Sequence, residues 1–440
     1  MNINDLLAPL PSDLPIPSFA LMSRRTQQLR AQRHVEVRVV GEDRSGEPIE
    51  MISMGDGAKS VLVIGAPHPN EPIGCIGIEW LIEQFAADAL LLRRTGCRWH
   101  FIKAIEPYAL KQNEAWFQRP DVRTYLQHFY RPPGDAQAEY AFPPAPGSDS
   151  SWQPVAENKA YQQALAIAQP DLLASLHNAE GSGAFYFVSR DDTVLAERLS
   201  AQALANGLPL NLLGEEAPDV REAPLAPAVF LLLEDTPPGS EPGDLPRPAG
   251  RSVTAWLAAQ VRRPPLFLVP EVPLFLDRRA ERLASMDACL DGVARMAWPA
   301  RLDALINQHL VHMDVAATPL EQLYLDAIRE MVPMFKKQLA ALPQLKAAPE
   351  DFESQVRAQL LLSLRPLAMT RRLAAMRAER ADLLDMAVCA RSTEQACARE
   401  LAEVLASPLL RDAFQPVPLR AAVATQLAAV LTAAQAVVQG

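Results

Sequence analysis

The sequence predicts an α/β domain followed by a region built of helices. Before residue 300, short runs rich in β-branched and aromatic residues alternate with longer helical patterns, as expected of an α/β fold. Turn-forming residues are concentrated in the same part, because 18 of the 19 glycines and 31 of the 39 prolines precede residue 300. We therefore expect one domain over residues 1–299 and a helical domain over residues 300–440.

The strands of the first domain are predicted from apolar runs and from alternation of apolar and polar residues. A hairpin and four further strands are expected, at residues 34–40 with 48–54, and at 60–64, 99–105, 184–188 and 266–269. Residues 215–250 contain eight prolines and are interpreted as a loop-like insertion lying over the α/β core.

The region after residue 300 is rich in Ala, Leu, Arg and Glu, which are good helix formers. Apolar residues recur at helical spacing in residues 320–331, 352–364 and 386–405, which predicts a helical bundle. Its apolar faces could pack on the first domain, cover a pocket or form a homodimer, and the sequence leaves these alternatives open.

Composition excludes several classes of protein. The net charge is -10 with both signs interspersed and no long Lys/Arg run, so no nucleic-acid partner is expected. No stretch of about 18 consecutive apolar residues predicts a membrane span. Residues 1–20 include two aspartates and four prolines, unlike a signal peptide. The five cysteines form no Cys-x-x-Cys pair, which argues against a disulfide framework and a thiolate zinc site. We therefore expect a cytoplasmic protein.

The most informative motif is His68-Pro-Asn-Glu71, which follows the apolar strand at residues 60–64 and precedes a helix opening near Pro72. A spacing of three residues across a strand-to-helix turn lets an imidazole and a carboxylate converge on one point. Strand ends of α/β sheets are common ligand sites. A catalytic zinc site needs three protein ligands and an open position, and two His with one Glu is a known ligand set.

His177 is the best candidate for the third ligand, because it ends the apolar run at residues 172–176. His34, His100 and His128 compete in principle, although His100 lies in an alternating strand pattern and the other two lie in polar segments. The sequence thus predicts one metal ion, interpreted as zinc, held by His68, Glu71 and His177. Other transition metals accept the same ligands.

Glu271 follows the apolar strand at residues 266–269 and is the candidate general base. A metal alone does not hydrolyse an amide quickly, because a base must take a proton from the water and hand it to the leaving nitrogen. A carboxylate at a buried strand end is suited to this work.

The ordered set of His-x-x-Glu, a lone His about a hundred residues later and a Glu after a late strand resembles the zinc carboxypeptidase family. The resemblance covers roughly residues 35 to 290 and implies a mixed central sheet flanked by helices. It also implies that an Asn and one or two Arg bind the substrate carboxylate, and Asn113 is the matching Asn. The family's Arg usually adjoins that Asn, whereas Glu114 follows here.

The carboxylate-binding arginine is therefore sought elsewhere, at Arg119, Arg123 or Arg131, and Arg131 has the most structured setting. An Arg suits a two-pronged grip on a carboxylate. Tyr186 is a further candidate to face the pocket. The substrate-covering Tyr that the resemblance implies shortly before the base is missing, since no tyrosine lies between Tyr186 and Glu271.

Three functions follow from these patterns. The first is a metallocarboxypeptidase-type protease that cleaves a peptide or amide bond next to a free carboxylate, with Glu271 acting on the metal's water. The second is a deacylase of small N-acyl amino acids, of the desuccinylase and aspartoacylase type that this layout also resembles. The third is a catalytically silent binding protein on the same fold.

Overall fold

The computed structural model describes most of the chain, and structural statements below concern these residues. The described residues are 2–147, 151–214, 224–232, 249–261, 263–278, 292–293, 298–310, 313, 317–344, 349–380 and 384–439.

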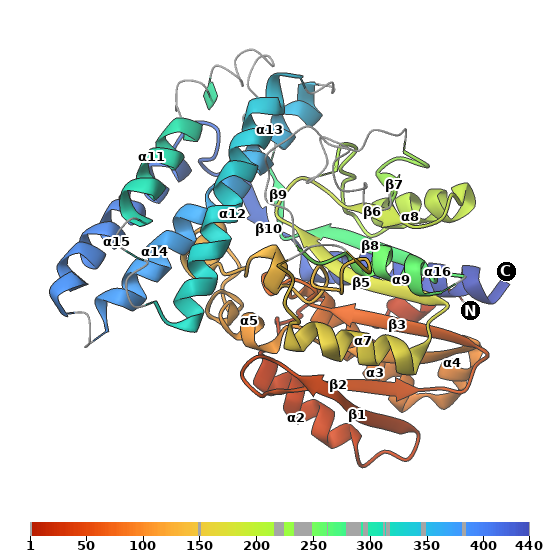
Figure 1. Cartoon of the computed structure of the whole chain (residues 1–440). Helices are drawn as coiled ribbons and strands as arrows, with labels where there is room; N and C mark the ends of the chain where they lie inside the picture. The colour runs from red at the N-terminus through yellow and green to blue at the C-terminus, as the bar shows by residue number, and fades with distance from the viewer. Residues whose placement is uncertain are drawn as a thin grey trace.

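An eight-stranded mixed sheet forms the centre of the protein (Figure 1). The strands are β1 (Val35–Glu42), β2 (Pro48–Met54), β3 (Lys59–Gly65), β4 (Cys97–Ile102), β5 (Leu172–Ala179), β6 (Phe185–Val188), β7 (Val229–Leu231) and β8 (Leu266–Pro273). Their order is β1-β2-β4-β3-β5-β8-β6-β7. The four central strands β4, β3, β5 and β8 run parallel, β1 and β2 pair antiparallel with their neighbours, and β6 pairs antiparallel with β8 but parallel with β7. The predicted hairpin and strands are confirmed.

Helices cover both faces of the sheet, so the central strands are apolar on both sides. In β3, Val61 and Val63 belong to one apolar core and Leu62 and Ile64 to the other, as the two-residue period of a strand requires. The first core contains side chains of α3 (Ile73–Ala87), α8 (Thr193–Ala205) and α16 (Leu419–Gln439). The second contains side chains of α7 (Ala156–Ala168) and α9 (Val253–Gln260).

Shorter elements complete the first 280 residues. They are α1 (Ile3–Leu7), α2 (Phe19–Leu29), α4 (Ala89–Arg94), α5 (Pro107–Lys111), α6 (Val122–His128) and the 3-10 turns η1 (Glu114–Trp116) and η2 (Gly134–Ala136).

The proline-rich stretch at 215–250 is only partly described. Residues 215–223 and 233–248 lie outside the described residues, so their place over the core stays a prediction. The described part contains β7, which pairs in parallel with β6 and extends the sheet by one strand. Part of the predicted loop-like insertion is therefore sheet.

The region after residue 300 contains the predicted bundle. Its helices are α11 (Trp298–Leu310), α12 (Pro319–Ala341), α13 (Pro349–Ser363), α14 (Arg365–Ala378) and α15 (Leu384–Leu405), with the 3-10 turn η3 (Leu342–Gln344). Helix α14 contacts the other four helices (α11, α12, α13 and α15). A fully buried Trp298 indole donates a hydrogen bond to the Ser363 hydroxyl at 2.7 Å and joins the ends of α11 and α13.

Two elements near the C-terminus of this region lie with the α/β part instead of the bundle. Strand β10 (Phe414–Pro416) pairs with β9 (Phe275–Asp277), and α16 packs on β5, β8, α3 and α8. Helix α16 is long and apolar enough to cross a membrane, but 78% of its apolar window is buried inside the protein. Its setting is that of a core helix. The division into domains at residue 300 remains a prediction.

Candidate metal centre

His68 and Glu71 lie in the turn between β3 and α3. The Glu71 N–H donates to the His68 carbonyl at 3.1 Å, which closes the turn. The first N–H of α3, on Ile73, donates to the Asn178 side-chain oxygen at 3.0 Å. A Cβ on Gly74 would lie 2.6 Å from the Leu176 Cβ, so glycine lets the start of α3 approach β5 closely. The turn is thereby held against the end of β5.

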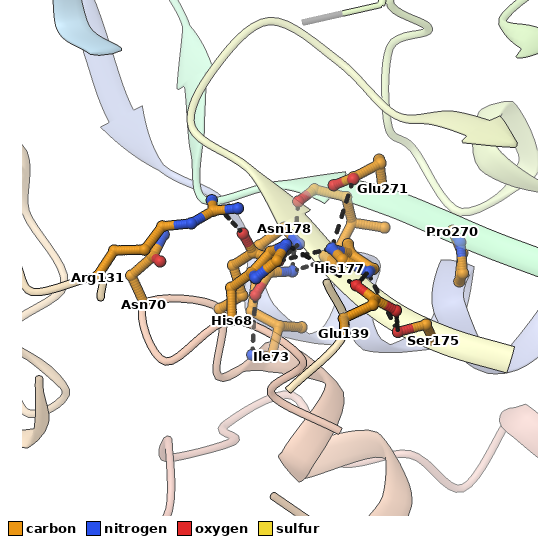
Figure 2. Close-up of polar contacts among 12 residues, drawn as sticks. His68, Asn70, Ile73, Arg131, Glu139, Ser175, His177, Asn178, Pro270 and Glu271 are labelled. Carbon is orange, nitrogen blue, oxygen red and sulfur yellow. Dashed lines mark hydrogen bonds and ion pairs between the residues drawn. The ribbon is translucent and has the colours of Figure 1, made fainter. Parts of the chain in front are cut away.

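His177 and Glu271 project from the same face of the sheet, because they are direct partners on the parallel strands β5 and β8. His177 Nδ1 lies 3.0 Å from Glu71 Oε2 and 3.7 Å from Glu271 Oε1 (Figure 2). The Asn178 N–H also donates to Glu71 Oε2 at 3.1 Å. Parallel strands that end at one edge thus bring together residues far apart in the sequence.

His68, Glu71 and His177 form a group that could hold a metal ion, with one ligand atom from each within 4.8 Å of the others. All three are buried, with 2%, 3% and 5% of their surface exposed. His68 Nδ1 is buried and has no hydrogen-bond partner in the described part of the chain. An unpaired buried nitrogen beside a carboxylate and a second imidazole fits a metal ligand.

The charges around the group also suit a cation. Burial and the nearby Arg131 hold the pKa of His68 well below its usual value, so this ring is a neutral donor. Burial alone would lower the pKa of His177, but Glu139 and Glu271 together hold it well above its usual value. The carboxylates around His177 therefore favour positive charge at this position, whether a proton or a metal ion supplies it.

Glu139 is a member of the site that sequence reasoning missed. Its Oε2 lies 3.0 Å from His177 Nε2, the ring nitrogen that faces away from Glu71. The Ser175 hydroxyl donates to its other oxygen at 2.8 Å. Although burial opposes it, the charge of His177 lowers the pKa of Glu139. A carboxylate on the second nitrogen of a ligating His fixes its tautomer and orientation. Glu139 lies outside the helices and strands, and no spacing in the sequence distinguishes it.

Of the three candidate arginines, Arg131 is the one that lies beside the group of His68, Glu71 and His177. Its Nη1 lies 3.4 Å from Glu71 Oε1, and the side chain is 10% exposed. Arg119 is on the surface, with a side chain 82% exposed and paired with Asp121 at 2.9 Å. Arg123 is exposed as well. The position of Arg131 fits its predicted part in binding a carboxylate, which stays a prediction.

Asn113 and Tyr186 are both buried, and the structure gives each a packing role. The Asn113 side chain donates to the Tyr130 carbonyl at 2.8 Å and accepts from the Tyr130 N–H at 3.0 Å. It thus holds the backbone beside Arg131. Tyr186 follows Phe185, the partner of Glu271 on β6, so its side chain points to the opposite face of the sheet from Glu271. Contact of either residue with a substrate stays a prediction.

The competing histidines lie outside the group. His100 Nδ1 is 2.8 Å from the Ser53 hydroxyl within the sheet, and His34 Nε2 is 3.1 Å from the Ala86 carbonyl. His128 is the last residue of α6, and its carbonyl accepts a hydrogen bond from Arg372.

No protein-family model matches the chain, and no curated protein sequence does either. Among solved structures, it is similar to carboxypeptidase A from Helicoverpa armigera, with 12% identity over 59% of this chain and 65% of that one, at a TM-score of 0.39. It is also similar to metallo-carboxypeptidases from Burkholderia cenocepacia (14% identity, TM-score 0.36) and Pseudomonas aeruginosa (16%, 0.36), each over 58% of this chain and 60% of the other.

The three matched proteins are named carboxypeptidases, which is the family that the sequence motifs resemble. The chain spans 65%, 60% and 60% of the length of the three matched proteins. At this identity and TM-score, the similarity assigns no activity and no residue role to this chain.

Proposed function

We propose that the protein is a metal-dependent hydrolase that cleaves an amide bond next to a free carboxylate. The observation that carries the proposal is the convergence of His68, Glu71 and His177 on one buried point, with Glu271 beside them. Two imidazoles and a carboxylate, with a further carboxylate near them, are the parts that metal-assisted amide hydrolysis requires.

His68, Glu71 and His177 would hold the metal, interpreted as zinc. When bound, zinc polarises a carbonyl oxygen and lowers the pKa of water near it. Glu139 holds the His177 ring from behind, at Nε2, so that Nδ1 stays turned toward Glu71.

Glu271 is the proposed general base. It projects from the same face as His177 and is 8% exposed. It would take a proton from the attacking water and deliver it to the leaving nitrogen, which makes the amine a better leaving group. A Glu is suited to this exchange because one carboxylate serves as base and then as acid.

Arg131 is the proposed anchor for the substrate's carboxylate. Its guanidinium lies beside Glu71, so a carboxylate bound there would lie close to the metal ligands. A planar guanidinium binds a carboxylate through two parallel hydrogen bonds, which fixes the orientation of the substrate.

One form of this reaction is the deacylation of a small N-acyl amino acid. Each of the four residues His68, Glu71, His177 and Glu271 is at most 8% exposed, so in either form the reacting amide would have to enter a mostly buried site. A peptidase of the carboxypeptidase type is the alternative that shares every step.

The deacylase and the peptidase can be distinguished by the length of the substrates they accept, and the role of the substrate's carboxylate can be tested with C-terminal amides. Metal-loaded protein would be assayed with N-acyl amino acids, with C-terminally free peptides, and with the same compounds carrying a C-terminal amide. We expect turnover of the small free acids and loss of at least tenfold in kcat/KM for the amides. Turnover of peptides with equal efficiency would favour the peptidase, and no turnover of any compound would contradict a hydrolase.

A further inference from the structure

The segment from His128 to Gly134, which carries Arg131, is held in place by side chains of the helical region. The Arg372 guanidinium, on α14, donates to the carbonyls of His128 at 2.7 Å and Phe129 at 3.1 Å. On α12, the Glu330 carboxylate accepts the Gly134 N–H at 2.9 Å. These contacts come from residues about 200 to 240 positions away in the chain. Helix α14 also contacts α6, the helix that ends at His128, and Figure 1 shows the helical region beside α5.

Aromatic contacts strengthen the same attachment. The rings of Tyr130 and Tyr324 lie 4.7 Å apart, and the Arg365 guanidinium lies 5.1 Å from the centre of the Phe129 ring. Arg365 also forms an ion pair with Glu180, which follows the end of β5. Helix α14 therefore contacts both the Arg131 segment and the loop after His177.

Two side chains that are far apart in the sequence, Arg372 and Asn113, donate hydrogen bonds to the three consecutive carbonyls before Arg131. Arg372 holds those of His128 and Phe129, and Asn113 holds that of Tyr130. Pro132 and Pro133 follow directly, and each restricts the backbone because its ring fixes φ. The Cα of Arg131 thus has little freedom, and its side chain starts from a defined point.

We propose that the helical region sets the position of Arg131, with Arg372 as the positioning residue that determines affinity for the carboxylate of the substrate. This inference rests on the proposed function of Arg131. Arg372 does not itself contact the metal ligands; it acts through the backbone that presents Arg131. Both hydrogen bonds come from Nη1, whose two N–H groups are fixed in the plane of the guanidinium, whereas the N–H groups of a lysine ammonium rotate on a flexible stem.

The test measures binding of N-benzoylglycine and of N-benzoylglycinamide by calorimetry to metal-loaded protein in which Glu271→Gln prevents turnover of the acid; this protein without any other substitution stands for the wild type in the comparison, and the variants below are added to it. These two compounds differ only in carboxylate against carboxamide. For the wild type we expect a preference of at least tenfold for the acid. Arg372→Met keeps the apolar stem and should reduce this preference by about tenfold, while metal content stays at the wild-type value. Arg372→Lys should retain part of the preference and also serves if the Met variant is unstable.

Arg371→Met is the matched control, because Arg371 is the neighbouring cation on α14 and pairs with Glu394 at 3.5 Å instead of with the Arg131 segment. It should leave the preference unchanged. Adding Arg372→Met to Arg131→Met should have no further effect on the preference, because Arg372 acts through Arg131.

The outcomes are distinguishable. An Arg372→Met protein that is folded, metal-loaded and as selective as the wild type would overturn the inference alone. So would additive losses in the double variant, which would give Arg372 a role independent of Arg131. A wild type without any preference for the acid would overturn the proposed function of Arg131, and this inference with it.

Discussion

Replacing Glu139 by glutamine should weaken metal binding about 100-fold, the upper end of the usual effect of a residue behind a metal ligand. Glutamine keeps the shape of the side chain and an oxygen that accepts from Ser175, so the change removes mainly the negative charge. The carboxylate oxygen lies 3.0 Å from His177 Nε2, and the residue is only 4% exposed. Water therefore cannot replace it readily.

The expected range for such a loss is about 10- to 100-fold, or roughly 1.4 to 2.7 kcal/mol. Competition with a chromophoric chelator at fixed pH and salt would measure the affinities of both proteins. Glu403→Gln is the control for net charge, because its side chain is 66% exposed in the helical region. An affinity of Glu139→Gln within twofold of the wild type would refute the role of Glu139 in orienting His177.

Three further predictions concern the site and its supports. His68→Ala should reduce bound metal to under about a tenth per chain in elemental analysis, because two remaining ligands do not hold zinc tightly; full stoichiometry would contradict the ligand set. Asn113→Ala should lower the free energy of unfolding by about 2 to 3 kcal/mol, because it leaves the buried N–H and carbonyl of Tyr130 unpaired; urea unfolding measures this, and an unchanged midpoint would count against it. Burial raises the pKa of Glu106 to about 8, so the stability it contributes is present below about pH 4.5 and is lost as pH rises toward 8. Glu106→Gln should therefore have a free energy of unfolding roughly 3 kcal/mol above that of the wild type at pH 7 and about equal to it at pH 4.5. Urea unfolding of both proteins at the two pH values measures this, and a difference that is the same at both would contradict the reasoning.

The grouping of the candidate ligands His68 and His177 with the candidate base Glu271 could be predicted from the sequence because each of the three follows an apolar run. His68 lies just beyond the end of β3, and His177 and Glu271 lie within the last three residues of β5 and β8; these strands pair in parallel, so their ends meet at one edge of the sheet. Strand ends can be read locally, from where an apolar run stops. The order of the strands then brings together side chains that are up to about 200 residues apart.

Glu139 and the supports of Arg131 could not be predicted in this way. Glu139 lies in a turn, where no period indicates which way a side chain points. Arg372 and Glu330 look like ordinary charged residues on amphipathic helices, and only the packing of α12 and α14 shows that they contact the Arg131 segment. Helix α16 follows the bundle helices in the sequence, and its packing on the sheet depends on long-range contacts.

The central claim is that a metal ion held by His68, Glu71 and His177 works with Glu271 to hydrolyse an amide. The most direct test compares bound metal and turnover of N-acyl amino acids in the wild type and in Glu271→Gln. We expect one metal ion per chain in both proteins and a loss of at least 10²-fold in kcat in the variant, since a general base contributes about 10²- to 10⁴-fold. A wild type without stoichiometric metal, or a variant with undiminished turnover, would contradict the account.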